Sequence, residues 1–247
     1  MKVFQAEIFP YMEVFTVPSL SLKDVNILQS AIYLTDDIKK LIPQFNNFML
    51  DSGAFTFMTQ SKNKSINWDE YIDDYINLIN EHKIKLYFEL DIDGIIGYDK
   101  VLAIRKKLER ETGVQPIPVW HKRLGKEEWF KMCDEYPYVA LGGIAAKEFS
   151  QNEHKHFTWF INEAHKRNAK IHGLGYTSIN GLYKYHFDSV DSSSWTAGNR
   201  FGSIYTFDGK KMQITQKPAG TRVKSKETAI HNFAEWVKFA KWADTHL

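Results

Sequence analysis

Short apolar runs alternate with helical patterns along most of the chain, and this alternation limits the folds available to it. Apolar residues recur at helical spacing over residues 67–82 and 98–112, while the runs 85–90, 117–120 and 138–141 are typical of buried strands. Strands that alternate with helices form right-handed βαβ units and so predict a parallel sheet. About seven such units fit, which favours an α/β fold of the (β/α)8 TIM-like barrel type over an open doubly wound sheet. No Gly-x-Gly-x-x-Gly motif follows a predicted strand, which argues against a dinucleotide-binding fold.

The remaining elements follow from the same patterns, within one expected domain that spans residues 1–247. Asn67 should cap the first of the two helices named above, and Gly113 should end the second. A β-hairpin that turns at Asp208-Gly209 is expected over residues 201–215. The other expected elements are helices over 24–34, 126–135, 152–167, 178–184 and 225–245, and strands over 48–51, 170–172 and 187–190.

The composition narrows the class of protein. Hydrophobic residues make up 43% of the chain and the formal net charge is +2, which is ordinary for a folded globular protein. No apolar run approaches the ~20 residues of a membrane span, and the N-terminus lacks a signal-peptide pattern, so we expect a cytoplasmic protein without membrane contact. Cys133 is the only cysteine, which excludes an internal disulfide and a zinc site built from several cysteines. We expect neither a metal nor a cofactor.

Polar and glycine-rich segments stand where the predicted strands end. Active sites of (β/α)8 barrels lie at the carboxyl ends of the strands, so these segments form the candidate site. Carboxylates there can act as nucleophile, acid/base or ligand anchor, and glycines let a planar ligand approach the backbone. The segments are Asp51-Ser52-Gly53, Asp91-Ile92-Asp93-Gly94, Trp120-His121, Gly142-Gly143, His172-Gly173-Leu174-Gly175 and Asp188-Ser189-Val190-Asp191.

Each segment also has a purely structural interpretation. An aspartate at the end of a strand often caps the next helix or shapes a turn. Gly142-Gly143 can form a tight turn, and His121 and His172 can be hydrogen-bonded histidines of the core. Aspartates recur on three separate strands, each followed closely by glycine or serine, and this recurrence favours a functional site for the set.

Three of these segments together resemble a known family. Asp51-Ser52-Gly53-Ala54-Phe55 resembles the D-S-G-G-F motif of the guanine transglycosylases, which insert 7-deazaguanine bases into tRNA or DNA. Leu141-Gly142-Gly143-Ile144-Ala145 is similar to their G-G-L-A segment, and Phe187-Asp188-Ser189-Val190 to the F-D-C/S-V/A stretch that holds their nucleophile. The resemblance covers roughly residues 45–205. The chain length and the continuation Asp191-Ser192-Ser193-Ser194-Trp195 look most like the compact, phage-borne branch of the family.

The resemblance implies a role for each matching residue. Asp188 would be the nucleophile that attacks the sugar C1′ and displaces guanine, and Asp51 would be the general acid/base or would hold the ribose and base. Asp91 would read the guanine-like base, and Gly142 and Gly143 would offer backbone N–H groups to its carbonyl. The other residues expected to contact the substrate are Ser52, Gly53, Phe55, Asp93, Trp120, His121, His172 and Asp191.

The chain departs from the family pattern in ways that bear on its substrate. The cysteine-rich zinc subdomain of the tRNA-acting relatives is missing, Ala54 replaces the second glycine of D-S-G-G-F, and Ser192-Ser193-Ser194 replaces the usual Pro-Thr-Arg. These differences favour DNA over tRNA as the acceptor. If the match shifts by three residues, Asp191 rather than Asp188 is the nucleophile.

The expected partners are nucleic acid and a free base of the 7-deazaguanine type. Arg105 and the other basic residues of the helix over 98–112 are expected to face solvent. Two alternative functions stay open: base excision with water as acceptor, by an N-glycosylase or glycosidase, and a non-catalytic barrel that binds a base or nucleic acid. Residues of the last third of the chain that could track phosphates, or simply form a solvated surface, are Asn199, Arg200, Lys210, Lys211, Lys217, Arg222, Lys224 and Lys226.

Overall fold

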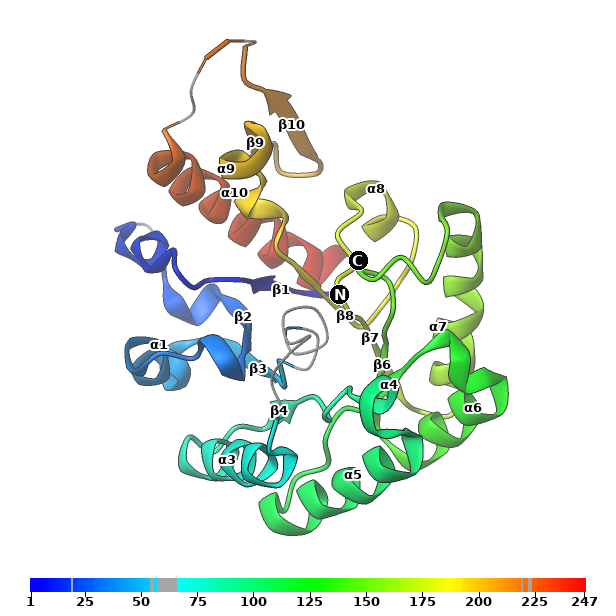
Figure 1. Cartoon of the computed structure of the whole chain (residues 1–247). Helices are drawn as coiled ribbons and strands as arrows, with labels where there is room; N and C mark the ends of the chain where they lie inside the picture. The colour runs from blue at the N-terminus through cyan, green and yellow to red at the C-terminus, as the bar shows by residue number, and fades with distance from the viewer. Residues whose placement is uncertain (19, 54–55, 57–65, 219, 222–223) are drawn as a thin grey trace.

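The computed structural model describes residues 1–18, 20–53, 56, 66–218, 220–221 and 224–247, and only the backbone of Asn199 and Arg200. Eight parallel strands form one sheet in the order β4-β3-β2-β1-β8-β7-β6-β5. The sheet curls around a central axis with helices outside it (Figure 1), which confirms the predicted (β/α)8 TIM-like architecture. The strands are β1 (Lys2–Ala6), β2 (Asn26–Ser30), β3 (Asn47–Asp51), β4 (Leu86–Tyr87), β5 (Val119–Trp120), β6 (Tyr138–Leu141), β7 (Lys170–Gly173) and β8 (Ser189–Ser192).

The barrel closes at a seam between β4 and β5. The Ile117 N–H donates to the Tyr87 carbonyl at 2.8 Å, and the Glu89 N–H donates to the Ile117 carbonyl at 3.1 Å. The Glu89 carboxylate accepts from the Val119 N–H at 2.6 Å and from Arg105 Nε at 2.6 Å. The expectation that Arg105 faces solvent is therefore wrong, because this guanidinium is buried against a carboxylate that ties the seam together.

The helices that alternate with the strands follow the predicted pattern in most places. The Asn67 side chain accepts from the Glu70 N–H, and Gly113 ends its helix in the left-handed conformation (φ 67°), as predicted. The helices are α1 (Asp36–Leu41), α3 (Trp68–Glu81), α4 (Asp93–Ile96), α5 (Tyr98–Thr112), α6 (Gly125–Glu135), α7 (Phe157–Lys166), α8 (Ile179–Leu182), α9 (Ala197–Phe201) and α10 (Ser225–His246), with short 3-10 segments between them.

The prediction of a helix over residues 24–34 is wrong. This stretch forms β2 between two 3-10 turns, η2 (Leu22–Asp24) and η3 (Ala31–Tyr33). Strand β2 lies between β1 and β3, and its first four residues are all buried. A parallel strand that is covered on both faces has no polar side, so its apolar residues can imitate helical spacing.

Alternate residues of each strand point into the barrel. The interior is filled by an apolar cluster that is separate from the larger core between strands and helices. In β8, Ser189 and Asp191 face inward, whereas Val190 belongs to the outer core. The buried residues of the interior cluster are Phe4, Ala6, Leu28, Met49, Phe88, Ile117, Val119 and Ala140.

The C-terminal region adds a hairpin and a long helix to the barrel, as predicted. Strands β9 (Ser203–Phe207) and β10 (Met212–Gln216) pair antiparallel, and α10 packs on β9 and on β1. The Asn232 Oδ1 and Glu235 Oε2 atoms of α10 accept backbone N–H groups of β9, which fixes the hairpin to the helix. Within the described ranges, no helix has the length and apolar character to cross a membrane.

Candidate active site

A cavity of about 430 Å³ opens at the carboxyl ends of the strands, where a barrel enzyme carries its chemistry. Three carboxylates from different parts of the barrel line it: Asp51 ends β3, Asp91 follows β4, and Asp191 lies in β8. A space of this size suits a small planar ligand. The cavity is also lined by Ala6, Glu7, Leu28, Phe88, Val119, His121, Gly143, Ala145, Ala146, Leu174, Gly175, Thr177 and Ser193.

The Asp51-Ser52-Gly53 turn holds the first carboxylate. The Gly53 N–H donates to Asp51 Oδ2 at 3.2 Å, and Gly53 has a φ of 75°. A Cβ atom on Gly53 would stand 2.5 Å from Cδ1 of Ile32, so the turn requires glycine. Burial raises the pKa of Asp51 to about 6; the Gly53 N–H opposes this rise, and the negative charges of Asp191 and Asp91 add to it.

Asp191 is held by two groups at one of its oxygens. The Gly175 N–H donates to Asp191 Oδ1 at 2.6 Å, and His172 Nε2 lies 3.1 Å from the same atom. The carboxylate is buried, with 7% of the residue exposed, and it borders the cavity. A fixed carboxylate at the floor of a cavity suits a nucleophile.

The prediction that Asp188 lies at the carboxyl end of its strand is wrong. It precedes β8, and its Oδ2 accepts from the Ile171 N–H at 2.8 Å and contacts His165 Nε2 at 2.9 Å. Its carbonyl accepts from the Lys2 N–H at the start of β1. Asp188 therefore lies at the amino ends of the strands, opposite the cavity, and its position in the alternating pattern directs it away from the interior.

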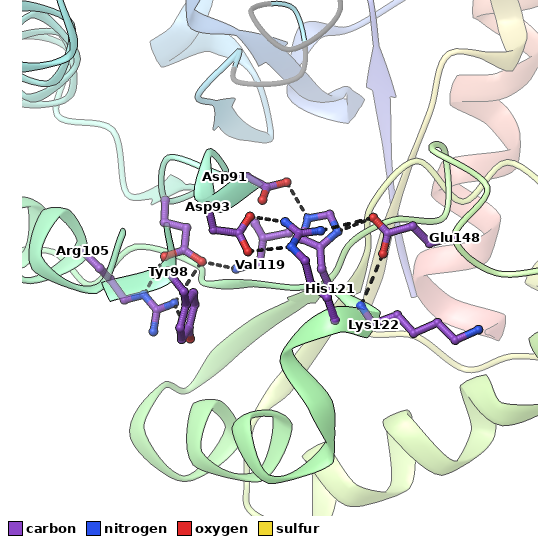
Figure 2. Close-up of polar contacts among 10 residues, drawn as sticks. Asp91, Asp93, Tyr98, Arg105, Val119, His121, Lys122 and Glu148 are labelled. Carbon is purple, nitrogen blue, oxygen red and sulfur yellow. Dashed lines mark hydrogen bonds and ion pairs between the residues drawn. The ribbon is translucent and has the colours of Figure 1, made fainter. Parts of the chain in front are cut away.

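A second group of charged residues surrounds His121 at the cavity wall (Figure 2). Its Nε2 lies 2.7 Å from Asp91 Oδ2, and its Nδ1 lies 2.8 Å from Glu148 Oε1. Burial alone would lower the pKa of His121, but the hydrogen bonds and charges of the two carboxylates outweigh burial and raise it. The two carboxylates thus favour the protonated ring, which can donate to both of them.

The two glycines after β6 differ in what they offer. The Gly142 N–H donates to the Trp120 carbonyl at 2.9 Å, so it is not available to a ligand, contrary to the expectation for this residue. The Gly143 N–H has no acceptor among the described residues, and Gly143 lines the cavity. A Cβ atom on Gly143 (φ 75°) would stand 2.6 Å from Oε2 of Glu148, so this wall also requires glycine.

Several predicted contact residues lie outside the cavity. Trp120 is buried in the outer core, where its Nε1 donates to the Gly125 carbonyl at 2.7 Å and its ring packs on Phe160. Asp93 forms an ion pair with Arg123. Ser52 is buried beside Asp51, and His172 lies under the cavity rather than at its wall. Phe55 lies outside the described residues.

The predicted basic residues are divided between the two ends of the barrel. Lys210 and Lys211 form the hairpin turn, near the part of α10 whose Ala243 carbonyl accepts from the N-terminus at the start of β1. Lys224 and Lys226 begin α10 at its other end, beside α9, which follows the carboxyl end of β8. Arg222 and the side chains of Asn199 and Arg200 lie outside the described part of the chain, and Lys217 is half-buried near the second group.

Glu148 is the main site residue that the sequence patterns do not identify. It follows Gly143 by five residues, in a turn without a helical or strand pattern, and the Gly143 carbonyl accepts from its N–H at 2.9 Å. The one available signal is an acidic residue shortly after a glycine pair. The sequence gives a clearer indication that Ser189 belongs to the site. It lies two residues before Asp191 in the same strand, so the two side chains must lie on the same face of the sheet.

Comparison with known proteins adds no assignment. No protein-family model matches the chain, and no curated protein matches it either. Among the residues that the structure describes, no group of three or more His, Cys, Asp or Glu side chains has the arrangement of a metal site.

Proposed function

We propose that this chain is a pentosyltransferase that exchanges guanine in nucleic acid for a base of the 7-deazaguanine type, through a covalent bond between Asp191 and the sugar. One observation carries the proposal: two carboxylates with different environments, Asp51 and Asp191, line the same cavity. Asp191 accepts two hydrogen bonds at one oxygen, whereas Asp51 has a pKa raised to about 6. A fixed carboxylate and a second, protonatable one are what retaining glycosyl transfer requires.

In the first step, an oxygen of Asp191 attacks C1′ of the sugar as the bond between C1′ and the guanine nitrogen breaks. The electron pair of that bond passes to guanine, which takes the proton of Asp51 and leaves as a neutral base. The sugar remains attached to Asp191 as an ester. A pKa of about 6 leaves part of Asp51 protonated near neutral pH, as a general acid requires.

In the second step, the incoming base gives a ring N–H proton to Asp51, its nitrogen bonds to C1′, and the ester bond to Asp191 breaks. The Asp191 carboxylate is thereby restored, and the proton count is unchanged over the cycle. The ester also removes a negative charge that helps to raise the pKa of Asp51. The loss of that charge as the ester forms lowers the pKa of Asp51, which favours transfer of its proton to the departing guanine in the first step.

Base recognition belongs to the wall made by Asp91, His121 and Gly143. A guanine-like base has an N1–H and an amino group as donors, which suit the Asp91 carboxylate, and a carbonyl that suits the Gly143 N–H. The hydrogen bond between His121 Nε2 and Asp91 Oδ2 holds this carboxylate in place. A cavity inside the mouth of a barrel also requires the target base to leave its stack before it can react.

The test is to incubate the protein with labelled guanine and, in parallel, duplex DNA, single-stranded DNA or tRNA. Incorporation of label, together with a denaturation-resistant adduct of protein and nucleic acid, supports the proposal; we expect it with DNA. Release of guanine without incorporation would instead identify a glycosidase that uses water. Asp191→Asn is the test variant, and Asp188→Asn is its control, because the two remove the same charge at opposite ends of β8.

A further inference from the structure

A line of polar side chains, most of them buried, lies inside the barrel beneath Asp191. His172 is fully buried, with its Nε2 3.1 Å from Asp191 Oδ1 and its Nδ1 2.5 Å from Ser189 Oγ. The Tyr138 hydroxyl makes a short hydrogen bond with the same Ser189 Oγ. Three strands, β6, β7 and β8, thus contribute one side chain each to a chain of contacts that ends at the carboxylate.

The chemistry of the end groups sets the direction of these hydrogen bonds. An ionised Asp191 can only accept, so His172 must donate from Nε2. The Nδ1 atom of a neutral ring then accepts from the Ser189 hydroxyl, whose oxygen accepts from Tyr138. Burial raises the pKa of Tyr138 to about 12, so this hydroxyl keeps its proton. With the ring protonated at Nε2 alone, every proton in the line points toward Asp191.

The ring of His172 has little freedom to leave this arrangement. Phe4 packs against it edge-on at a centroid distance of 6.1 Å, and Phe88 packs against it at 5.3 Å. The Gly175 N–H reaches the same Oδ1 atom of Asp191 from the loop after β7. Oδ1 is thus occupied by two donors that come from the strand and loop next to β8.

We propose that His172 is a positioning residue, which holds Oδ1 of Asp191 together with Gly175 so that Oδ2 is the atom that attacks C1′. This inference rests on the proposed exchange reaction. In the ester, Oδ1 becomes the carbonyl oxygen and still accepts both hydrogen bonds. When the bond between Oδ2 and C1′ breaks, the returning electron pair is shared with Oδ1, where the two donors stabilise it.

The test uses two amides of different length at position 172. In His172→Gln, the side-chain N–H can stand near the place of Nε2 and still donate to Asp191, whereas His172→Asn reaches only the place of Nδ1, beside Ser189. If the role is to orient the nucleophile, Asn should lower kcat by about 100-fold with an unchanged KM for the free base, and Gln should restore much of the loss. Equal kcat in both variants, or a higher kcat in Asn, would overturn the inference.

A measurement on the unmodified protein keeps the inference testable if either variant fails to fold. Nitrogen-15 NMR of labelled histidine reports which ring nitrogen of His172 carries the proton, and Asp191→Ala identifies the resonance that changes. A protonated Nε2 is expected, and an unprotonated Nε2 would overturn the inference. If wild-type protein exchanges no base while Nε2 is protonated, the proposed function fails and the hydrogen-bond geometry stands.

Discussion

Asp188 and Asp191 lie at opposite ends of β8, although three positions separate them in the sequence. Asp191 borders the cavity and accepts from Gly175, whereas Asp188 accepts from the Ile171 N–H at the amino ends of the strands. A shift of three residues along a strand changes both the end and the face on which a side chain lies. The resemblance to the transglycosylase motif places the proposed nucleophile at Asp188, whereas the geometry favours Asp191 for that role.

The first prediction separates these two aspartates. Asp191→Asn should fold normally, form no covalent adduct and lose exchange by orders of magnitude, because the attacking oxygen is gone. Asp188→Asn should keep exchange within a few-fold of wild type and lose about 1 kcal/mol of stability, because its contacts to His165 and Ile171 are weakened. Loss of exchange in Asp188→Asn alone would restore the assignment that the motif implies.

The second prediction concerns the pH dependence of the first half-reaction. Asp51 must be protonated to act as an acid, and its pKa is about 6, so kcat/KM for the nucleic acid should fall as pH rises through about 6. The second half-reaction needs Asp51 ionised, so kcat/KM for the incoming base should not show this fall. Asp51→Asn should abolish the pH dependence along with most of the rate. A flat profile in wild type between pH 5 and 8 would contradict the role of Asp51.

The third prediction is that the ionised form of Asp51 lowers the free energy of unfolding. Its pKa is about 6 in the folded state against an ordinary 3.8, so the folded state binds the proton more tightly than the unfolded state does. The free energy of unfolding should therefore fall as pH rises from about 4 to 6 and stay low above that. Asp51→Asn should raise the free energy of unfolding by up to about 3 kcal/mol at pH 7.5. Urea unfolding at pH 7.5 and 4 measures this, and a gain of equal size at pH 4 would refute the explanation.

The fourth prediction concerns His121. Because its pKa is raised, the imidazolium persists to a higher pH than for an ordinary histidine. As pH rises through that raised pKa, the ring loses one N–H and can donate to only one of its two carboxylates. The KM for free guanine should then increase at alkaline pH, since Asp91 competes with Glu148 for the one remaining N–H. His121→Gln should have a higher KM that no longer responds to pH. Glu148→Gln is the matched variant, and it should move the rise in KM to lower pH.

The fifth prediction uses the division of basic residues between the two ends of the barrel. Replacing Lys224 and Lys226 with alanine should weaken binding to DNA and make the slope of log K against log salt shallower by about 1–2, because they lie toward the cavity end. The control is Lys210→Ala with Lys211→Ala, which removes the same charge at the hairpin turn. A larger effect of the control pair would place the nucleic acid on the hairpin.

Apolar spacing and end signals within single elements were sufficient to predict part of this fold. Helices α3 and α5 carry both an apolar stripe and an end signal, Asn67 or Gly113, and their bounds lie within a residue of the predicted ones. Strand β2 is buried on both faces and lacks the alternation that marks a strand, so its pattern predicts a helix instead. Burial of Arg105 depends on Glu89, a partner on another element, which a helical pattern cannot reveal.

The candidate site, like the fold, could be predicted from the sequence only in part. The ends of strands predict where Asp51, Asp91 and Gly143 lie, because parallel strands bring their carboxyl ends to one face. Periodicity predicts which residues share a face but not where a strand begins, and the error at Asp188 follows from that. Glu148 is brought to His121 by the turn after β6, whose path no local pattern determines.

The seam of the barrel has a consequence for how the protein responds to heat. Two backbone hydrogen bonds and the side chain of Glu89 join the chain segments at β4 and β5. Other neighbouring strands, such as β2 and β3, pair over a longer stretch. Asp91 and His121 lie immediately beyond this junction, one on each side of it. Thermal opening at the seam would separate the two side chains while the rest of the barrel stays paired. Discrimination between guanine and other purines should therefore decline at a lower temperature than the one at which the protein unfolds.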